Sequence, residues 1–577
     1  MSLELESNAD ERLQAGLAHC TVQRWFDAKV CFEAALALEP HHKIAWNNLG
    51  NVLDELGERD AAIAAYSQAL ALDSNYANAK KNLAITAYQY GTAVYEQGKL
   101  DKALWFFGLA VAHGGKAFNY DHSYLQLLLE TCTHRGVAQH VSAMREQTYA
   151  DPAYHPHPYP LLAASDDPSW HLLAAKRHVE RLHLDAGIAN VALEHHFLPK
   201  KSDATYGVQR RIRIAYLSSD WHQNPVPQQL LAALEAHDRT VFEVIGIATD
   251  TVLDESPWRK RIEAAFERFD TLGHLPDAEI ADKLREMDID IAIDLSLYML
   301  GGRPMILQSR PARVQVAMLG YAGTSGAPWI DYSIADAVTV PPHLESFYSE
   351  KIIRVPGSFM PDNEERPAVI APKKRPTALI QYGLQKNFHD GVFVFCAFNN
   401  PYKITPEVLT CWFRLLHAVP KSVLWLQANN SVTQANLEAA AIAAGLGDGR
   451  LVFAKRVDSF AEHLQRYTVA DLFLDTFPYN AHVTAADSLW AGLPVLTLQG
   501  QSFASRVASS ILTTLGLPEL ITTDLASYEA RALELATDAA QLNAIRSKLA
   551  NAKAAGKYFN QAQYVRGLEQ AYRNISL

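Results

Sequence analysis

Cysteine is scarce in this chain of 577 residues, and the five that occur are odd in number and widely scattered: Cys20, Cys31, Cys132, Cys396 and Cys411. No CxxC pair and no Cys/His spacing typical of zinc sites occurs, so we expect reduced thiols, a cytoplasmic location and no metal site. The start, Met-Ser-Leu-Glu-Leu-Glu, lacks the apolar core of a signal peptide. No run of about 18 apolar residues occurs, so we expect no membrane span.

Positive charge is also in deficit, because 52 Lys and Arg stand against 63 Asp and Glu, a net charge of −11. This argues against a nucleic-acid partner bound by phosphate neutralisation. The apolar share of 49% and the charged share of 20% suit a globular protein. The chain is too long for one core, so we expect roughly three or four domains.

A pattern of small and aromatic residues repeats near the start of the chain. The first copy is Gly16, Ala28, Phe32, Ala35 and Pro40, and 34 residues later it becomes Gly50, Ala62, Tyr66, Ala69 and Ser74; a third copy follows after a slip of 7 residues, with Gly91, Gly98, Ala103, Phe107 and Ala110. This is the tetratricopeptide (TPR) pattern, in which small residues lie where paired helices touch. We therefore expect a TPR-like α-solenoid over 1–118. It is either a spacer or a groove that binds an extended protein or peptide acceptor.

The next region, 119–205, reads as helical and then irregular. The segment His155-Pro-His-Pro-Tyr-Pro160 predicts a turn or extended loop, since each proline restricts the residue before it. Its histidines lack a regular ligand spacing, so we interpret them as surface residues.

From Ile212 onward, short apolar strands alternate with helices. Strands are predicted at 212–217, 242–247 and 289–295, with an amphipathic helix at 277–287, and then at 392–398, 423–427, 450–453, 472–474 and 494–497. This alternation indicates two parallel, helix-covered sheets, and hence two Rossmann-like domains over 206–375 and 387–577. A polar stretch rich in Pro and Lys, 361–386, joins them, and a helix at 564–575 closes the chain. A cleft is expected between the carboxyl ends of the two sets of strands.

One turn in the second series has the chemistry of a nucleotide site. In the stretch 472–487, an apolar strand ends in a polar turn that opens directly into a helix. Such a turn presents backbone N–H groups and the positive end of a helix dipole, which suit a phosphate. His482, Thr484 and Asp487 lie in the same turn, and the Asp487 carboxylate could hold a ribose.

Residues 210–570 resemble the catalytic region of the protein O-GlcNAc transferase/SPINDLY family, family 41. The resemblance rests on four segments: Gln315-Val-Ala-Met-Leu-Gly-Tyr-Ala-Gly-Thr-Ser-Gly326, Phe398-Asn-Asn-Pro-Tyr-Lys-Ile404, Asp475-Thr-Phe-Pro-Tyr-Asn-Ala-His-Val-Thr484 and Phe503-Ala-Ser-Arg-Val507. It implies a TPR segment followed by a GT-B fold of two Rossmann-like domains, with 120–205 lacking a clear counterpart. It also implies inverting transfer of a sugar, GlcNAc from UDP-GlcNAc, to Ser or Thr hydroxyls of proteins, with no cofactor.

The resemblance also implies roles for individual residues. Lys403 matches a lysine at the nucleotide diphosphate, where an ammonium would offset charge on the leaving group. Asn400 stands where animal members carry a glutamine beside the phosphates. The other implied contacts are His463 and Arg466 at the nucleobase, His482, Val483 and Thr484 at the phosphates, Asp487 at the ribose, and Leu319 and Gly320 near the sugar.

Three positions depart from the family pattern. Asn224 stands where a histidine usually precedes the proline, and an amide is no base at neutral pH. We assign Asn224 to substrate binding, and either His222 or a donor phosphate takes the acceptor proton; an extended strand would point His222 and Asn224 the same way. Phe460 replaces a lysine near the ribose, and Ala322 replaces a proline beside the sugar. GDP-fucose or UDP-glucose as donor therefore remains an alternative, as does a TPR scaffold with an inactive transferase domain.

Overall fold

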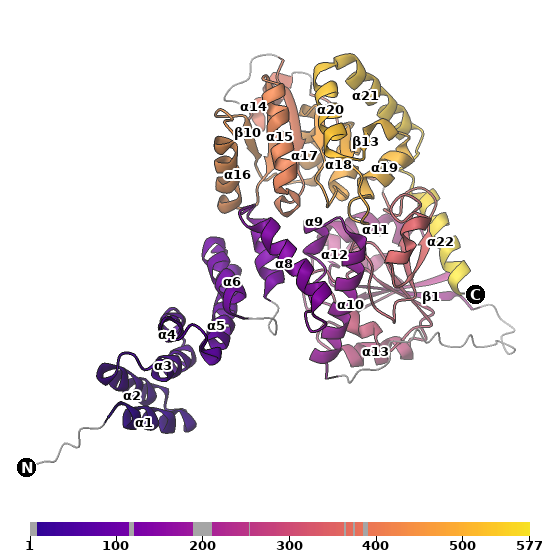
Figure 1. The fold of residues 1–577 in the computed structure, drawn as a ribbon. Helices are drawn as coiled ribbons and strands as arrows, with labels where there is room; N and C mark the ends of the chain where they lie inside the picture. The colour runs from indigo at the N-terminus through magenta and orange to yellow at the C-terminus, as the bar shows by residue number, and fades with distance from the viewer. Residues whose placement is uncertain are drawn as a thin grey trace, which may run out of the picture. The chain divides into compact units, whose positions relative to one another are not determined.

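The computed structural model describes residues 8–114, 120–187, 210–252, 254–362, 365–372, 375–384 and 391–576 (Figure 1). Parts of the regions predicted from sequence, namely 1–7, 115–119, 188–209, 253, 363–364, 373–374, 385–390 and 577, lie outside the described residues. The chain divides into two compact units: residues 1–131 with 136–156, and residues 132–135 with 157–577. Among the described helices, none combines the length and the apolar character needed to cross a bilayer.

The first unit is entirely helical, in agreement with the predicted TPR-like solenoid. Its helices are α1 (Ala9–Thr21), α2 (Trp25–Leu38), α3 (Lys43–Glu55), α4 (Arg59–Leu72), α5 (Ala77–Glu96), α6 (Leu100–Gly114), α7 (Asp121–Glu130) and α8 (Val137–Ala150). Successive helices pack as the pairs α1/α2, α3/α4 and α5/α6.

Glycine permits the close contact within each pair. A Cβ built on Gly16 would lie 2.6 Å from the ring of Phe32, one on Gly50 2.4 Å from Tyr66, and one on Gly91 2.8 Å from Phe107. The spacing from glycine to ring is the same in all three copies. The 7-residue slip lies in α5, which has 20 residues where α3 has 13, so two additional helical turns absorb it.

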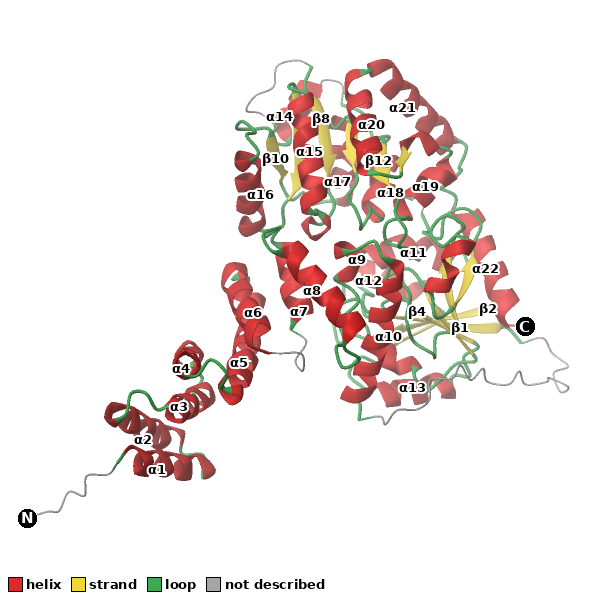
Figure 2. Ribbon diagram, in the orientation of Figure 1, coloured by secondary structure: helices red, strands yellow, loops and turns green. Residues whose placement is uncertain are grey.

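The second unit contains two parallel sheets (Figure 2). The first has the order β3-β2-β1-β4-β5-β6-β7 and the second the order β10-β9-β8-β11-β12-β13. Their strands are β1 (Ile212–Ser218), β2 (Phe242–Ala248), β3 (Arg268–Thr271), β4 (Ile291–Asp294), β5 (Val314–Ala317), β6 (Tyr332–Ala335) and β7 (Lys351–Arg354), then β8 (Phe393–Ala397), β9 (Ser422–Gln427), β10 (Leu451–Ala454), β11 (Leu472–Leu474), β12 (Val495–Leu498) and β13 (Ile521–Thr522). The predicted two-Rossmann fold is confirmed, and every predicted strand is present within two residues of its expected ends.

Helices flank the sheets in the usual alternation (Figure 2). They are α9 (Leu161–Ala164), α10 (Pro168–Asp185), α11 (Pro225–Glu235), α12 (Pro257–Ala264), α13 (Asp277–Glu286), α14 (Arg375–Gln381), α15 (Pro406–Ala418), α16 (Ser431–Ala443), α17 (Phe460–Arg466), α18 (Val483–Trp490), α19 (Val507–Leu515), α20 (Leu525–Thr537), α21 (Ala539–Ala554) and α22 (Gln561–Ser576), with short 3₁₀ turns η1 (Pro304–Leu307), η2 (Pro342–Phe347), η3 (Pro401–Lys403), η4 (Tyr467–Val469) and η5 (Pro518–Leu520).

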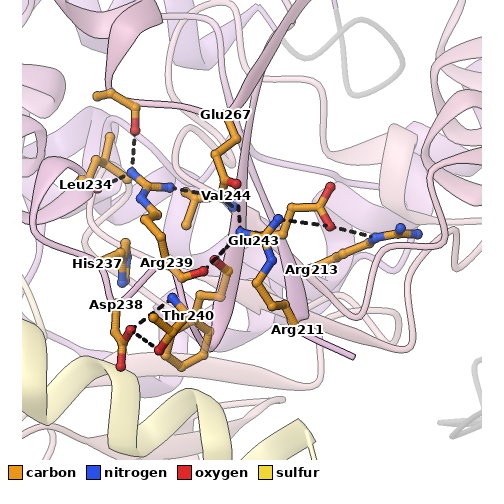
Figure 3. Close-up of polar contacts among 12 residues, drawn as sticks. Arg211, Arg213, Leu234, His237, Asp238, Arg239, Thr240, Glu243, Val244 and Glu267 are labelled. Carbon is orange, nitrogen blue, oxygen red and sulfur yellow. Dashed lines mark hydrogen bonds and ion pairs between the residues drawn. The ribbon is translucent and has the colours of Figure 1, made fainter. Parts of the chain in front are cut away.

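Ion pairs lie at the amino end of the first sheet (Figure 3). Arg213 Nε donates to Glu243 Oε2 at 3.0 Å, and Arg211 Nη1 donates to Glu267 Oε2 at 2.7 Å. These side chains are about one-third exposed, so each pair adds little stability. They lie at the opposite end of the sheet from the carboxyl ends, where ligands bind in such folds.

The segment 157–187 packs within the second unit. Pro158 and Pro160 are buried, the ring of His157 lies 4.5 Å from that of His178 in α10, and the Tyr159 hydroxyl donates to that of Tyr402 at 3.3 Å. The expectation of an exposed loop with surface histidines is therefore wrong here, because these side chains pack against α10 and against Tyr402 of the second unit.

Helix α22 returns to the first sheet. The hydroxyls of Tyr572 and Tyr216 lie 3.1 Å apart, and Glu569 Oε1 accepts from the backbone N–H of Asp238 at 2.7 Å and lies 3.1 Å from His237 Nδ1. The helix that ends the second Rossmann series is thus anchored on strand β1 and on the turn after α11.

Candidate functional site

The candidate site lies at the switch point of the second sheet. Strands β8 and β11 are neighbours in this sheet. The chain continues from β8 to β9 and β10 on one side, and from β11 to β12 and β13 on the other side. The loops that follow two such strands diverge and leave a crevice at their carboxyl ends. The segments 398–403 and 475–482 are these two loops.

Asp475 shapes the loop after β11. Its Oδ1 accepts from the backbone N–H groups of Thr476 at 2.7 Å and Ala481 at 2.6 Å, and from Asn399 Nδ2 at 3.2 Å. Its Oδ2 accepts from Thr497 Oγ1 at 2.6 Å. Burial raises the pKa of this carboxyl, and the donated hydrogen bonds and the nearby Lys403 oppose that rise. Asp475 therefore holds the two switch-point loops together.

Lys403 provides a buried ammonium between the same loops. Its Nζ donates to the backbone carbonyl of Asn480 at 2.9 Å and lies 3.8 Å from the centre of the Tyr479 ring. Burial lowers the pKa of Lys403 from its ordinary value, against the opposing field of Asp475. The Asn480 carbonyl, the rings of Tyr479 and Tyr402 and the field of Asp475 compensate this buried cation in part. An anion in the crevice would stabilise it further.

Residues 132–135 hold the backbone on either side of Lys403. The His134 ring nitrogen Nε2 lies 2.9 Å from the carbonyl of Ile404, and the Cys132 thiol donates to the carbonyl of Pro401 at 3.5 Å. The position of the ammonium is thus determined by a distant part of the chain.

Helix α18 points its amino end into this crevice. His482 is the N-cap residue of α18, and its side chain makes no hydrogen bond to the backbone N–H groups of the first helical turn. Burial and the charge of Lys403 hold the pKa of His482 well below its ordinary value, so the ring is neutral. Its Nε2 lies 3.5 Å from the carbonyl of Ala504, and the Thr484 hydroxyl donates to Asn399 Oδ1.

Asp487 lies one turn farther along α18 and is held by two side chains. Its Oδ2 lies 3.2 Å from His463 Nε2, and Arg466 Nη2 lies 2.6 Å from His463 Nδ1. Because Arg466 can only donate, His463 carries its proton on Nε2 and donates to Asp487. Arg366 Nη1 donates to Asp487 Oδ1. Burial would raise the pKa of Asp487, but Arg366 and His463 outweigh it and the pKa lies below its ordinary value.

A cavity of about 440 Å³ opens beside Asp487. Residues from both Rossmann domains line it, among them Gln223, Arg366, Phe460, Val483 and Asp487. Its volume is in the range of small-molecule sites.

Leu319 and Gly320 lie in the loop after β5 of the first sheet. Leu319 has a φ of +71°, a left-handed conformation that costs a bulky residue energy and often marks a functional loop. A Cβ on Gly320 would lie 2.1 Å from the carbonyl oxygen of Leu295, so no larger residue fits. Glu350 accepts from the Ser325 N–H at 3.0 Å and holds the following turn.

The segment after β1 differs from its prediction. Residues 219–224 are irregular, with bends at 219 and 222–224, rather than an extended strand, so His222 and Asn224 are not aligned by strand geometry. Asn224 is the N-cap of α11, where its Oδ1 accepts from the Val226 N–H at 3.2 Å. His222 Nδ1 lies 3.9 Å from Asp250 Oδ2. Of this segment, Gln223 lines the cavity described above.

Most of the predicted residues gather at the switch point, and three contributors were missed. Lys403, His482 and Thr484 surround the crevice. Val483 and Asp487 line the cavity, His463 contacts Asp487, and Arg466 contacts His463. Asn400 is exposed, with Oδ1 3.4 Å from Asn429 Nδ2. Sequence reasoning missed Asn399, Asp475 and Arg366. An aspartate directly after a buried strand was a usable signal for Asp475. Within the described residues, no group of three His, Cys, Asp or Glu side chains is arranged to hold a metal ion.

Comparison with known sequences identifies the family of this chain. A profile of the family described as glycosyl transferase family 41 matches residues 137–366 and 363–568. This chain belongs to glycosyl transferase family 41. A tetratricopeptide-repeat profile also matches residues 44–76. The view that 120–205 lacks a counterpart in the family is wrong from residue 137 onward.

Individual relatives agree with this assignment. The Arabidopsis thaliana protein named probable UDP-N-acetylglucosamine–peptide N-acetylglucosaminyltransferase SEC is 32% identical over 378 residues, which cover 65% of this chain and 38% of the relative. The Arabidopsis thaliana protein of that class named SPINDLY is 31% identical over 376 residues, 64% of this chain and 40% of the relative. This chain spans about two fifths of the length of these curated relatives.

A solved structure matches over the full length. A mutant of the Thermobaculum terrenum O-GlcNAc transferase aligns with a TM-score of 0.64 and 25% identity, covering 100% of this chain and 98% of the other. The order of a helical amino-terminal region and two Rossmann-like sheets is thus shared with a protein of that name.

Proposed function

We propose that this family 41 protein transfers N-acetylglucosamine from UDP-GlcNAc to Ser or Thr hydroxyls of proteins, with inversion at the anomeric carbon. The observation that carries the proposal is the buried Lys403 ammonium, held 2.9 Å from the Asn480 carbonyl beside the uncapped end of α18. The names of the curated relatives support the donor and the acceptor class.

The chemistry is a single in-line displacement. The acceptor oxygen bonds to the anomeric carbon while the bond from that carbon to the β-phosphate oxygen breaks, and UDP leaves with one additional negative charge. Lys403 and the N–H groups at the start of α18 meet that charge, which is larger in the transition state than in the bound donor. With these groups in place, the reaction as proposed needs no metal ion or other cofactor.

The acceptor proton needs a separate destination. Asn224 carries no titratable group and caps α11, so the proton passes either to a phosphate oxygen of the donor or to His222. Asp250 Oδ2 lies 3.9 Å from His222 Nδ1, too far for a hydrogen bond that would orient the ring. Turnover in His222→Gln separates the two routes: the phosphate route leaves it intact and the histidine route removes it.

The acceptor would be an extended peptide bound by the TPR helices. A cavity of about 440 Å³ in the first unit is lined by amide side chains, Asn48, Asn51 and Asn82, together with Trp25 and Tyr66. Amides donate and accept hydrogen bonds and so suit a peptide backbone of any sequence. The five thiols, none in a disulfide, suit a reducing compartment, and we propose the cytoplasm.

The test is sugar transfer from radiolabelled UDP-GlcNAc to a peptide library, with release of UDP as a second readout. We expect turnover in the wild type and a loss of about 10²–10³-fold in Lys403→Ala, the usual cost of removing one charge-stabilising group. Lys421→Ala, an exposed lysine just before β9, is the matched control and should keep full activity.

The competing interpretations have distinct outcomes. If calorimetry shows tighter binding of GDP than of UDP, the donor is a GDP-sugar and the choice of UDP-GlcNAc is wrong. If the wild type binds UDP but turns over no donor, the chain is a TPR scaffold with an inactive transferase region, and Lys403→Ala changes nothing in the assay.

A further inference from the structure

Arg366 is placed in the candidate donor site by a segment that sequence reasoning assigned to a linker. It is almost fully buried: its side chain is 6% exposed, and those of its partners Asp362 and Asp487 are 1% and 4% exposed. Its Nε donates to Asp362 Oδ1 at 2.7 Å and its Nη1 to Asp487 Oδ1. Arg366 and Asp487 both line the 440 Å³ cavity.

The neighbouring backbone is docked on the second Rossmann domain. Trp490 Nε1 in α18 donates to the carbonyl of Pro367 at 2.9 Å, and the Ile370 N–H donates to Gln465 Oε1 in α17 at 3.2 Å. The guanidinium carbon lies 5.9 Å from the centre of the Phe460 ring. Arg366 is therefore held from two helices that also carry Asp487, His463 and Phe460.

Asp487 keeps acceptor capacity toward the cavity. A carboxylate has about four lone-pair directions, and in this structure Oδ1 accepts from Arg366 while Oδ2 faces His463. Each oxygen can accept one additional hydrogen bond. Two hydroxyls on adjacent carbons, such as the 2′ and 3′ hydroxyls of a ribose, match two acceptors on one carboxylate.

Arg366 keeps the Asp487 carboxylate able to accept these hydrogen bonds. A buried carboxylate without a cation takes up a proton, and one of its oxygens then becomes a donor instead of an acceptor. Asp362 and Asp487 share this guanidinium, which donates one hydrogen bond to each carboxylate through a different nitrogen. The cation reaches the site from the segment between the two sheets, 121 residues from Asp487 in sequence.

We propose that Arg366 is a specificity-determining residue that makes the donor site select ribonucleotides over 2′-deoxyribonucleotides, acting through Asp487. The proposal rests on the proposed use of a nucleotide sugar. It predicts that removing the guanidinium weakens the contact with the ribose hydroxyls more than the contact with the diphosphate.

The experiment measures dissociation constants of UDP and 2′-deoxy-UDP by calorimetry at pH 7. We expect the wild type to prefer UDP by about tenfold, the value of one hydrogen bond to a charged group. In Arg366→Gln the preference should shrink to less than about threefold, since Asp487 loses its orienting charge. In Asp487→Asn it should shrink equally, and the double variant should add no further loss.

Controls separate this role from a structural one. Arg414→Gln removes an arginine of a solvent-exposed pair with Glu529 and should keep the tenfold preference. If a thermal melt shows that Arg366→Gln does not fold, Arg366→Lys carries the test: it keeps the charge but loses the planar fork, and its preference for UDP should fall about threefold.

The outcomes are distinguishable. An undiminished preference for UDP in a folded Arg366 variant overturns the inference and leaves the proposed function standing. A wild type that binds neither nucleotide overturns the proposed function, and the inference with it.

Discussion

Binding of a nucleotide sugar should take up a proton at Lys403. Burial lowers the pKa of this ammonium in the unliganded protein. The two phosphates of a nucleotide sugar carry one negative charge each, and their field raises the pKa of a nearby ammonium. The bound state therefore holds a proton that part of the unliganded population lacks. Affinity is greatest below the pKa of the unliganded protein and falls as pH rises from that pKa toward the pKa of the complex.

The size of the effect follows from Coulomb's law. One unit of charge at about 4 Å from the ammonium, with an effective dielectric constant of about 20, contributes about 4 kcal/mol, or about three pKa units. Within the window, the dissociation constant should rise by about tenfold per pH unit. The hydrogen bond from Lys403 to the Asn480 carbonyl persists in either state and does not alter the sign.

Calorimetric titration of UDP-GlcNAc between pH 6.0 and 8.5 tests this, run at each pH in two phosphate-free buffers that differ in ionisation enthalpy. The difference in apparent enthalpy between the two buffers gives the number of protons taken up, which should approach one inside the window. Lys403→Met should bind more weakly at low pH and show no proton uptake, whereas Lys421→Ala should match the wild type. A dissociation constant that does not change with pH, or the same pH dependence in Lys403→Met, would refute the reasoning.

Two further variants test the site and the solenoid. Asp475→Asn replaces an acceptor of four hydrogen bonds with an amide that must present N–H groups to donors, so UDP affinity should fall by at least about tenfold; unchanged affinity by calorimetry would show that the turn does not depend on the carboxylate. Gly50→Ala should lower the unfolding free energy of the helical unit by about 1–3 kcal/mol, because its Cβ would lie 2.4 Å from the Tyr66 ring. Gly447→Ala, where nothing lies within 4 Å, is the control in thermal melts, and an equal response of the two variants would contradict the packing argument.

Sequence reasoning missed five of the described strands, β3, β5, β6, β7 and β13, each of four residues or fewer, and two of them have little apolar signal. Strand β3 (Arg268–Thr271) is a half-exposed edge strand that contains Arg and Asp, and β7 (Lys351–Arg354) begins and ends with a charged residue. Such strands form because a neighbour supplies the ladder of hydrogen bonds, which is a property of the sheet and not of the segment. The buried strands β1 and β8, by contrast, were predicted within one residue of their ends.

His222 shows a second kind of error. Its alignment with Asn224 was inferred from strand geometry, but Asn224 instead caps α11. A proline at the next position favours a helix start as readily as an extended segment. The structure thus changes which side chain of this loop reaches the cavity, and that side chain is Gln223.

The sequence by itself determined the repeat, the alternation of strands and helices, and the chemistry of the turn 475–487, because each of these depends on contacts between residues close in the chain. Only the tertiary structure decided which polar groups the buried charges meet. Lys403 meets Asn480 across 77 residues, and Arg366 meets Asp487 across 121. Electrostatic energy depends on distance and burial in space, and neither is encoded in a local pattern. An arginine in a polar, proline-rich stretch therefore reads as a solvated linker residue until the fold buries it against a carboxylate.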